Sequence, residues 1–225
     1  MDGEWFGWVM KFISFIFTNL CLTCGLSALD FQETKKLAEG GIGLAQYSLG
    51  LKYDNGEGVP QDDKEAVKWY RLSAEQGNAI AQYNLGVMYS KGTGVPQDDK
   101  EAVKWFRMSA EQGYADAQYN LGLMYANGEG VPQDNKEAVK WYRKSAEQGR
   151  AMGQINLGLM YATGKGVIED YITSYAWISV SKANGAVKAV GALDFLRKSM
   201  SKDQIAEGQK LAREIFKRTE ANKKD

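Results

Sequence analysis

The sequence predicts an all-α fold, a stacked solenoid of tandem repeats. The first observation is a stretch that recurs every 36 residues: three near-copies cover residues 45–80, 81–116 and 117–152, and a looser fourth covers 153–188. The second is that each copy carries two apolar stripes at helical spacing, and the third is a glycine-rich turn between them. A repeat of this length buries its apolar face only against its neighbours, so the copies are predicted to stack.

The first half of each copy is predicted to be a helix. In the second copy, Ala81, Leu85, Met88 and Tyr89 fall on one helical face. Gly86 lies inside this helix, where glycine costs about 1 kcal/mol relative to alanine. The glycine recurs in the other copies as Gly50, Gly122 and Gly158. We therefore expect another helix to pass too close to this position for a Cβ atom.

The second half of each copy is predicted to be another helix, reached through a turn. Gly92 can end the first helix in a left-handed conformation, and Gly94 gives the turn a second flexible point. Asp98 and Glu101 have the spacing of an N-terminal capping box headed by aspartate. The apolar stripe that follows consists of Ala102, Trp105, Phe106, Ser109 and Ala110. Helix, turn and helix therefore make up one repeat.

Residues 1–28 are predicted to be a secretory signal peptide. Lys11 supplies a positive charge, residues 12–22 an apolar run, and residues 25–28 a cleavage site with small residues. Since signal peptides usually lead with their basic residue, we place the true start at Met10 as a hypothesis. The alternative is an uncleaved membrane anchor over residues 12–29, which is only marginally long enough to span a bilayer.

Both cysteines of the chain, Cys21 and Cys24, fall in this segment. A Cys-x-x-Cys pair can be redox-active, but here we expect it to be removed with the signal peptide. After that removal no stable membrane anchor is expected.

The two ends of the array are predicted to be capped. Residues 29–44 are expected to form a polar N-terminal capping helix, and residues 189–225 C-terminal capping helices with a basic tail. Ser201 and Gln204 form a second capping box at the start of the last helix. The apolar positions expected to pack back on the array are Ile205, Leu211, Ala212 and Ile215.

Composition excludes several functions. The 28 basic residues equal the 28 acidic residues, so there is no general attraction to nucleic acid, and we predict no nucleic-acid partner. The absence of histidine removes histidine-assisted nucleophilic catalysis and the commonest zinc ligand. We expect no catalytic residues, no cofactor and no metal.

The repeat motifs resemble the Sel-one-like repeat family, a relative of the tetratricopeptide repeat. The resemblance rests on AQYNLGVMY in the first helix, GVPQD in the turn, and KEAVKW followed by SAEQG in the second helix. It implies a right-handed α/α superhelix that serves as a protein-interaction scaffold. Because bacterial members are often exported, it also implies a periplasmic or secreted protein with a protein or peptide partner.

One branch of this family, the Helicobacter cysteine-rich proteins, was described as penicillin-binding or weakly β-lactamase-active. That branch has a cysteine pair in each repeat, whereas the repeats of this chain have none. The chain does contain two Ser-x-x-Lys strings, Ser179–Lys182 and Ser199–Lys202, without the partner motifs of serine β-lactamases. We predict a protein that is not an enzyme, and keep a cysteine-free relative of that branch as the alternative. A purely structural envelope component is a third possibility.

The resemblance to tetratricopeptide arrays implies that the first helix of each repeat lines the concave face. Tyrosines and asparagines of those helices would then form two rows, suited to contact with a peptide. The candidate binding residues are Tyr47, Tyr83, Asn84, Tyr119, Asn120 and Asn156. The alternative is that the tyrosines pack between repeats and the asparagines bond locally.

The repeats differ most at a few positions while their frame stays constant. Two such sets are Leu44, Ile80, Asp116 and Met152, and Asn78, Tyr114 and Arg150. Variation inside a fixed frame indicates solvent exposure at these positions. It also suggests that they contribute to the choice of partner.

Overall fold

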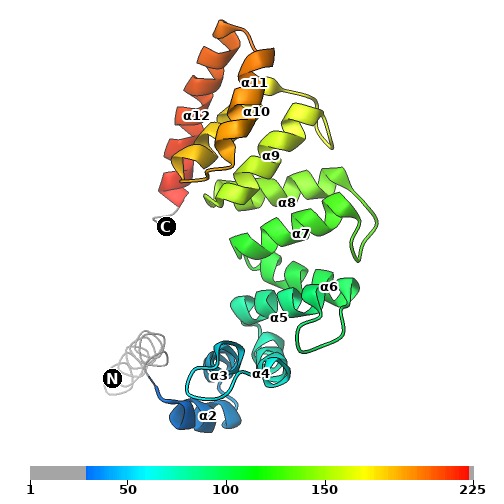
Figure 1. The fold of residues 1–225 in the computed structure, drawn as a ribbon, viewed down its shortest axis with the longest axis vertical. Helices are drawn as coiled ribbons and strands as arrows, with labels where there is room; N and C mark the ends of the chain where they lie inside the picture. Colours follow the sequence, from blue (N-terminus) through cyan, green and yellow to red (C-terminus); the bar gives the residue numbers. More distant parts are fainter. Residues whose placement is uncertain (1–28, 223–225) are drawn as a thin grey trace, which may run out of the picture. The chain divides into compact units, whose positions relative to one another are not determined.

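The computed structural model describes residues 29–222, and all of their regular secondary structure is helical (Figure 1). The predicted signal peptide therefore lies outside the described residues. The helices are α2 (Phe31–Glu39), α3 (Gly43–Asn55), α4 (Asp63–Glu75), α5 (Ala79–Lys91), α6 (Asp99–Glu111), α7 (Ala115–Asn127), α8 (Asn135–Glu147), α9 (Ala151–Thr163), α10 (Tyr171–Ala183), α11 (Ala189–Ser199) and α12 (Lys202–Asn222). The all-α solenoid predicted from the repeats is confirmed.

The described part of the chain divides into two compact units, with the boundary between Gln97 and Asp98. In the N-terminal unit α2 packs on α3, α3 on α4, and α4 on α5. In the C-terminal unit the helices from α6 to α10 pack on their neighbours in chain order. Each repeat therefore contributes a first helix and a second helix, as the two apolar stripes predict.

Helix ends follow the predicted local signals. The first helices α3, α5, α7 and α9 end at glycines in the left-handed conformation: Gly56, Gly92, Gly128 and Gly164. The second helix α6 begins after Asp98, whose carboxylate accepts hydrogen bonds from the backbone N–H groups of Lys100 and Glu101. These bonds satisfy donors that have no partner within the helix. Asp62 and Asp134 cap α4 and α8 in the same way.

The predicted close approach at the helix-interior glycine is confirmed at three positions, by Ile178 of α10 at Gly158 and by a tyrosine at the other two. A Cβ atom on Gly122 would lie 2.6 Å from Cδ1 of Tyr142, and one on Gly50 would lie 2.6 Å from Cδ1 of Tyr70. Both tyrosines belong to the second helix of the same repeat. The glycine therefore makes room for a side chain of its own helix pair.

Buried glutamines join successive repeats. The side-chain amide of Gln82 in α5 donates to the carbonyl of Ala74 in α4, at 3.0 Å, and Gln118 in α7 donates to Ala110 in α6 at 3.1 Å. Gln46 and Gln154 make the equivalent bonds at 3.2 and 3.1 Å. A buried polar group without a partner is costly, so these bonds fix how each helix pair meets the next.

The C-terminal end departs from the repeat pattern. Helix α11 buries Ala189 and Leu193, the residues predicted to be in phase with a first helix. Helix α12 then packs mainly against α10 (Figure 1). A Cβ atom on Gly208 would lie 2.8 Å from the ring of Tyr175. The Ser201–Gln204 capping box is present, with bonds of 2.9 and 3.2 Å. Of the four residues predicted to pack back, Ala212 and Ile215 are buried, and Ile205 and Leu211 are half-buried.

Within residues 29–222 no helix has both the length and the apolar character needed to cross a membrane.

Candidate peptide-binding surface

Two of the predicted tyrosines, Tyr47 and Tyr119, pack on the second helix of their own repeat. Tyr47 of α3 is half-buried, and its ring centroid lies 6.0 Å from that of Tyr70 in α4. Tyr119 of α7 is placed in the same way against Tyr142 of α8, at 6.1 Å. Burial raises the pKa of Tyr47 and of Tyr119, and the charge of Arg150 opposes the rise at Tyr119. Each of these tyrosines therefore offers one part of its ring to the core and leaves the rest accessible.

Two of the predicted asparagines, Asn84 and Asn156, contact tyrosines of the preceding repeat. Asn84 hydrogen-bonds with Tyr70, whose hydroxyl also donates to Asp54 at 2.9 Å. Burial, the largest cause, raises the pKa of Tyr70, and the neighbouring Asp54 raises it further. Asn84 of α5 therefore lies against α4, the second helix of the preceding repeat.

In the C-terminal unit, burial raises the pKa of Tyr142 to about 12, while a hydrogen bond with Asn156 acts against this rise. Asn156 also hydrogen-bonds with Tyr119. Asn120 is half-buried, whereas Ile155, which takes the tyrosine position in the fourth repeat, is a core residue with 6% exposure. Tyr119 and Asn156 are thus brought together.

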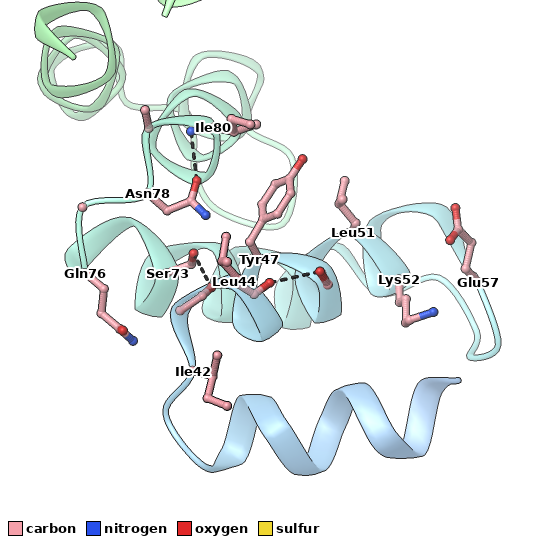
Figure 2. Close-up of a pocket in the computed structure, with 14 residues that line it drawn as sticks. Ile42, Leu44, Tyr47, Leu51, Lys52, Glu57, Ser73, Gln76, Asn78 and Ile80 are labelled. Carbon is pink, nitrogen blue, oxygen red and sulfur yellow. Dashed lines mark hydrogen bonds between the residues drawn. The ribbon is translucent and has the colours of Figure 1, made fainter. Parts of the chain in front are cut away.

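A groove of about 840 Å³ opens beside Tyr47 in the N-terminal unit. Its walls come from α3, the end of α4 and the start of α5 (Figure 2). Three aliphatic side chains along it are unusually exposed for their type: Ile42 at 39%, Leu44 at 38% and Ile80 at 39%. The Tyr47 ring rises from α3 between these walls, with its hydroxyl pointing away from the helix (Figure 2).

Hydrogen bonds fix the walls of this groove. The hydroxyl of Ser73 donates to the carbonyl of Gly43 at 2.7 Å, which ties α4 to the start of α3. The amide of Gln76 donates to Gln46 at 2.8 Å and to the Gly41 carbonyl at 3.1 Å. Asn78 accepts from the backbone N–H groups of two residues in the first turn of α5. The groove is therefore a formed feature of the two repeats that meet there.

The charged residues of the groove stand at one end. Lys52 and Glu57 lie at the C-terminal end of α3 and in the following turn, beside Leu51 (Figure 2). The other lining residues, from Ile42 to Ser48 and from Ser73 to Ile80, are uncharged. This part of the surface suits uncharged groups.

An ion pair occupies the equivalent place in the C-terminal unit. Nε of Arg150 lies 2.5 Å from Oδ1 of Asp116, and their side chains are 46% and 28% exposed. Counting back two repeats of 36 residues, these positions correspond to Asn78 and Leu44. The groove itself was not predicted, although variation at both positions had indicated an exposed surface.

The two Ser-x-x-Lys strings differ in their placement. Ser179 and Lys182 lie on α10, while Ser199 ends α11 and Lys202 begins α12. Among residues 29–222 there is no cluster of three or more His, Cys, Asp or Glu side chains that could hold a metal ion. The groove in the described part of the chain provides apolar surface and polar side chains that a bound molecule could contact.

Solved structures of bacterial repeat proteins are similar to this chain. A protective antigen present in uropathogenic Escherichia coli strains, which displays an SLR fold, is 34% identical with a TM-score of 0.79, over 86% of this chain and 42% of that one. A Sel1 repeat protein from Oxalobacter formigenes is 38% identical with a TM-score of 0.66, over 72% and 47%. This chain thus spans less than half the length of either. No curated protein matches it.

Cysteine-rich protein B of Helicobacter pylori is also similar, but at 24% identity and a TM-score of 0.48 the likeness does not bear on activity. The sequence model of the Sel1 repeat matches residues 43–78, 79–114, 115–149 and 151–182. Because these matches cover more than half of its residues, the chain belongs to the Sel1 repeat family.

Proposed function

We propose that this protein is a non-enzymatic scaffold that binds a protein or peptide partner in the bacterial envelope or outside the cell. Sel1 repeats are protein-interaction scaffolds, and the observation that carries the proposal here is the open apolar groove beside Tyr47. Its volume falls within the range of about 300–1,000 Å³ that is typical of ligand sites. A bound peptide that covered the three exposed aliphatic side chains would remove apolar surface from water, which is favourable in free energy.

Further binding residues are proposed on the first helices of each unit. They are Tyr47, Tyr83 and Asn84 in the N-terminal unit, and Tyr119, Asn120 and Asn156 in the C-terminal unit. The half-buried tyrosines support this role, because a ring already held on one side loses little conformational freedom on binding.

Export is proposed from the apolar run led by Lys11 and the small residues that follow it. The mass of the intact protein purified from cell envelopes should correspond to a chain that begins near Ala28–Asp30. A chain that still begins at Met1 or Met10 would contradict export with cleavage.

Peptide binding can be tested with a displayed library of random peptides selected on purified residues 29–225. We expect enriched peptides, and Tyr47→Ala should weaken the best of them more than about tenfold while helicity is retained. Leu72→Ala is the matched control, because Leu72 is 37% exposed on α4 and does not line the groove. Failure to enrich any peptide would contradict the proposal, and nitrocefin hydrolysis by the purified chain would contradict its non-enzymatic part.

A further inference from the structure

We infer that the positions of Leu44 and Asn78 are gate positions, which decide whether the junction between two repeats accepts a peptide. Leu44 and Asn78 leave the junction of the first two repeats open to an uncharged, extended peptide. Asp116 and Arg150, at the equivalent positions, close the junction between α7 and α9. This inference rests on the proposed peptide-binding function and specifies which site carries it.

The frame around the two junctions is the same. Ser73 donates to the carbonyl of Gly43 at 2.7 Å, and Ser145 donates to that of Ala115 at 2.8 Å. The bond from Gln76 to Gln46 measures 2.8 Å, as does its counterpart from Gln148 to Gln118. The groove residues Tyr47 and Leu51 of α3 also have identical counterparts in α7, Tyr119 and Leu123. The junctions differ at the gate positions and also at other lining positions, where Ile42, Ser48, Lys52 and Ile80 correspond to Tyr114, Asn120, Met124 and Met152. Only at the gate positions is an uncharged residue replaced by a charged one.

The ion pair places two opposite charges at the C-terminal junction, at positions where the open junction has none. Asp116 lies in the first turn of α7, and Arg150 is the residue that precedes α9, so their contact joins the two helices across the junction. An apolar peptide seated there would have to remove both charges from water, which is costly unless new partners are supplied. Arg150 also acts on Tyr119, the counterpart of the groove tyrosine, through its charge.

The open junction favours an uncharged peptide, because most of its lining residues carry no charge. Ile42, Leu44 and Ile80 present aliphatic surface, and the two charged lining residues stand together at the far end. A charged side chain placed among the aliphatic residues would lose hydration without gaining a partner. Uncharged aliphatic or aromatic residues are therefore the expected contacts.

The polar groups of the groove favour an extended backbone. The Ser48 hydroxyl, the Asn78 amide and the Tyr47 hydroxyl line the same groove as the aliphatic side chains. An extended chain exposes backbone N–H and C=O groups along its length, whereas a helix has already paired them. Side chains of an extended peptide alternate, so one face can meet the aliphatic wall while the backbone meets these polar groups.

The experiment exchanges the two gates. Random twelve-residue peptides displayed on phage are selected on the parent chain, and the best peptide is synthesised for calorimetric titration. We expect it to carry uncharged aliphatic or aromatic residues. Leu44→Asp with Asn78→Arg should lower its affinity by at least about tenfold. The variant should stay folded, because the same ion pair is accommodated at the equivalent place, but it should melt at a somewhat lower temperature, because Asn78 caps α5 and arginine does not replace that cap. Leu159→Asp is the control, since Leu159 is 43% exposed on α9 and outside the groove.

The reciprocal change, Asp116→Leu with Arg150→Asn, should create a second binding equivalent for the same peptide. If peptides are enriched but their affinity and stoichiometry are the same for the parent and both double variants, the gate positions do not control binding, although the protein does bind peptides. Enriched peptides rich in charged residues would overturn the proposed occupant. A folded reciprocal variant with no second equivalent would show that the ion pair is not what closes the junction. Selection that enriches nothing would instead remove the proposed function itself.

Discussion

Gly122 lies in the middle of α7 with the ring of Tyr142 directly over it. In isolation a glycine at this place weakens the helix, because it raises the entropy of the unfolded chain. In the structure, close packing between the two helices of the repeat offsets this cost. A Cβ atom on Gly122 would lie only 2.6 Å from the Tyr142 ring, so the ring can pack there only because the residue is glycine. The same contact recurs between Gly50 and Tyr70.

Gly122→Val should therefore destabilise the protein by about 1–3 kcal/mol, since the added side chain must displace the Tyr142 ring from a packed core. Gly191→Val is the matched control, because Gly191 is also in a helix but a Cβ atom there would meet nothing within 4 Å. Urea unfolding followed by circular dichroism measures both variants. Equal stabilities for the two variants would mean that the contact with Tyr142 is not what requires glycine.

Ionisation of Tyr142 is expected to lower the stability of the protein at alkaline pH. Its pKa in the folded protein is about 12, against an ordinary value of 10.0, so the folded state holds the hydroxyl proton between these values and the unfolded state does not. Its contribution to stability is thus fully present below pH 10 and is lost as the pH rises through about 12. Tyr142→Phe should reduce this alkaline loss by on the order of 1–3 kcal/mol. Comparing parent and variant by urea unfolding at pH 8 and near pH 11 checks the effect, and an equal loss in both would contradict it.

At the scale of the elements, the turns between helices do more than reverse the chain. Gly130 has a φ of 68°, and a Cβ atom on it would overlap the backbone carbonyl of Asp99, at the start of the preceding second helix. Gly94 and Gly166 meet Asp63 and Asn135 in the same manner. The second glycine of each turn is thus needed because the turn rests against the previous repeat.

Gly130→Ala should destabilise the protein more than Gly113→Ala. Both glycines have positive φ, at 68° and 95°, so alanine is strained at either position, but a Cβ atom on Gly113 would meet nothing within 4 Å. The difference between the two variants isolates the backbone contact, for which we expect on the order of 1–3 kcal/mol. The melting temperatures of the two variants measure this difference. If they are indistinguishable, glycine is needed at position 130 only for its positive φ and not for the contact with Asp99.

The local elements could be predicted because their signals are short in sequence. Asp98 as the N-cap, Gly92 as the helix end and the Ser201–Gln204 box each act within a few residues. The direction in which α12 packs could not be predicted, because an amphipathic pattern states that a face is buried but not which helix covers it. The groove was missed for a related reason: it forms only where side chains of two repeats meet.

At the scale of the whole molecule, stability is expected to be a sum over repeats and their interfaces. Trp105 tests this view, because it occupies a position that recurs as Trp69, Trp141 and Trp177 and is only 7% exposed. The prediction that Trp105 is a core residue is confirmed. Its indole N–H has no hydrogen-bond partner among the described residues, whereas that of Trp69 donates to Glu65 at 3.2 Å. Trp105 therefore acts in the array through its packing.

Trp105→Ala should cost about 3–5 kcal/mol, because a large buried side chain is replaced by a cavity. Since Trp105 belongs to the C-terminal unit, the loss falls on that unit first, and the N-terminal unit should keep its own transition. Calorimetry should then show a broadened or divided transition where the parent shows a narrower one. Trp105→Phe is the control: it keeps most of the apolar volume and removes only an N–H group without a partner, so it should remain close to the parent. A Trp105→Ala variant with parental stability but without peptide binding would contradict the core role and make Trp105 part of the binding surface.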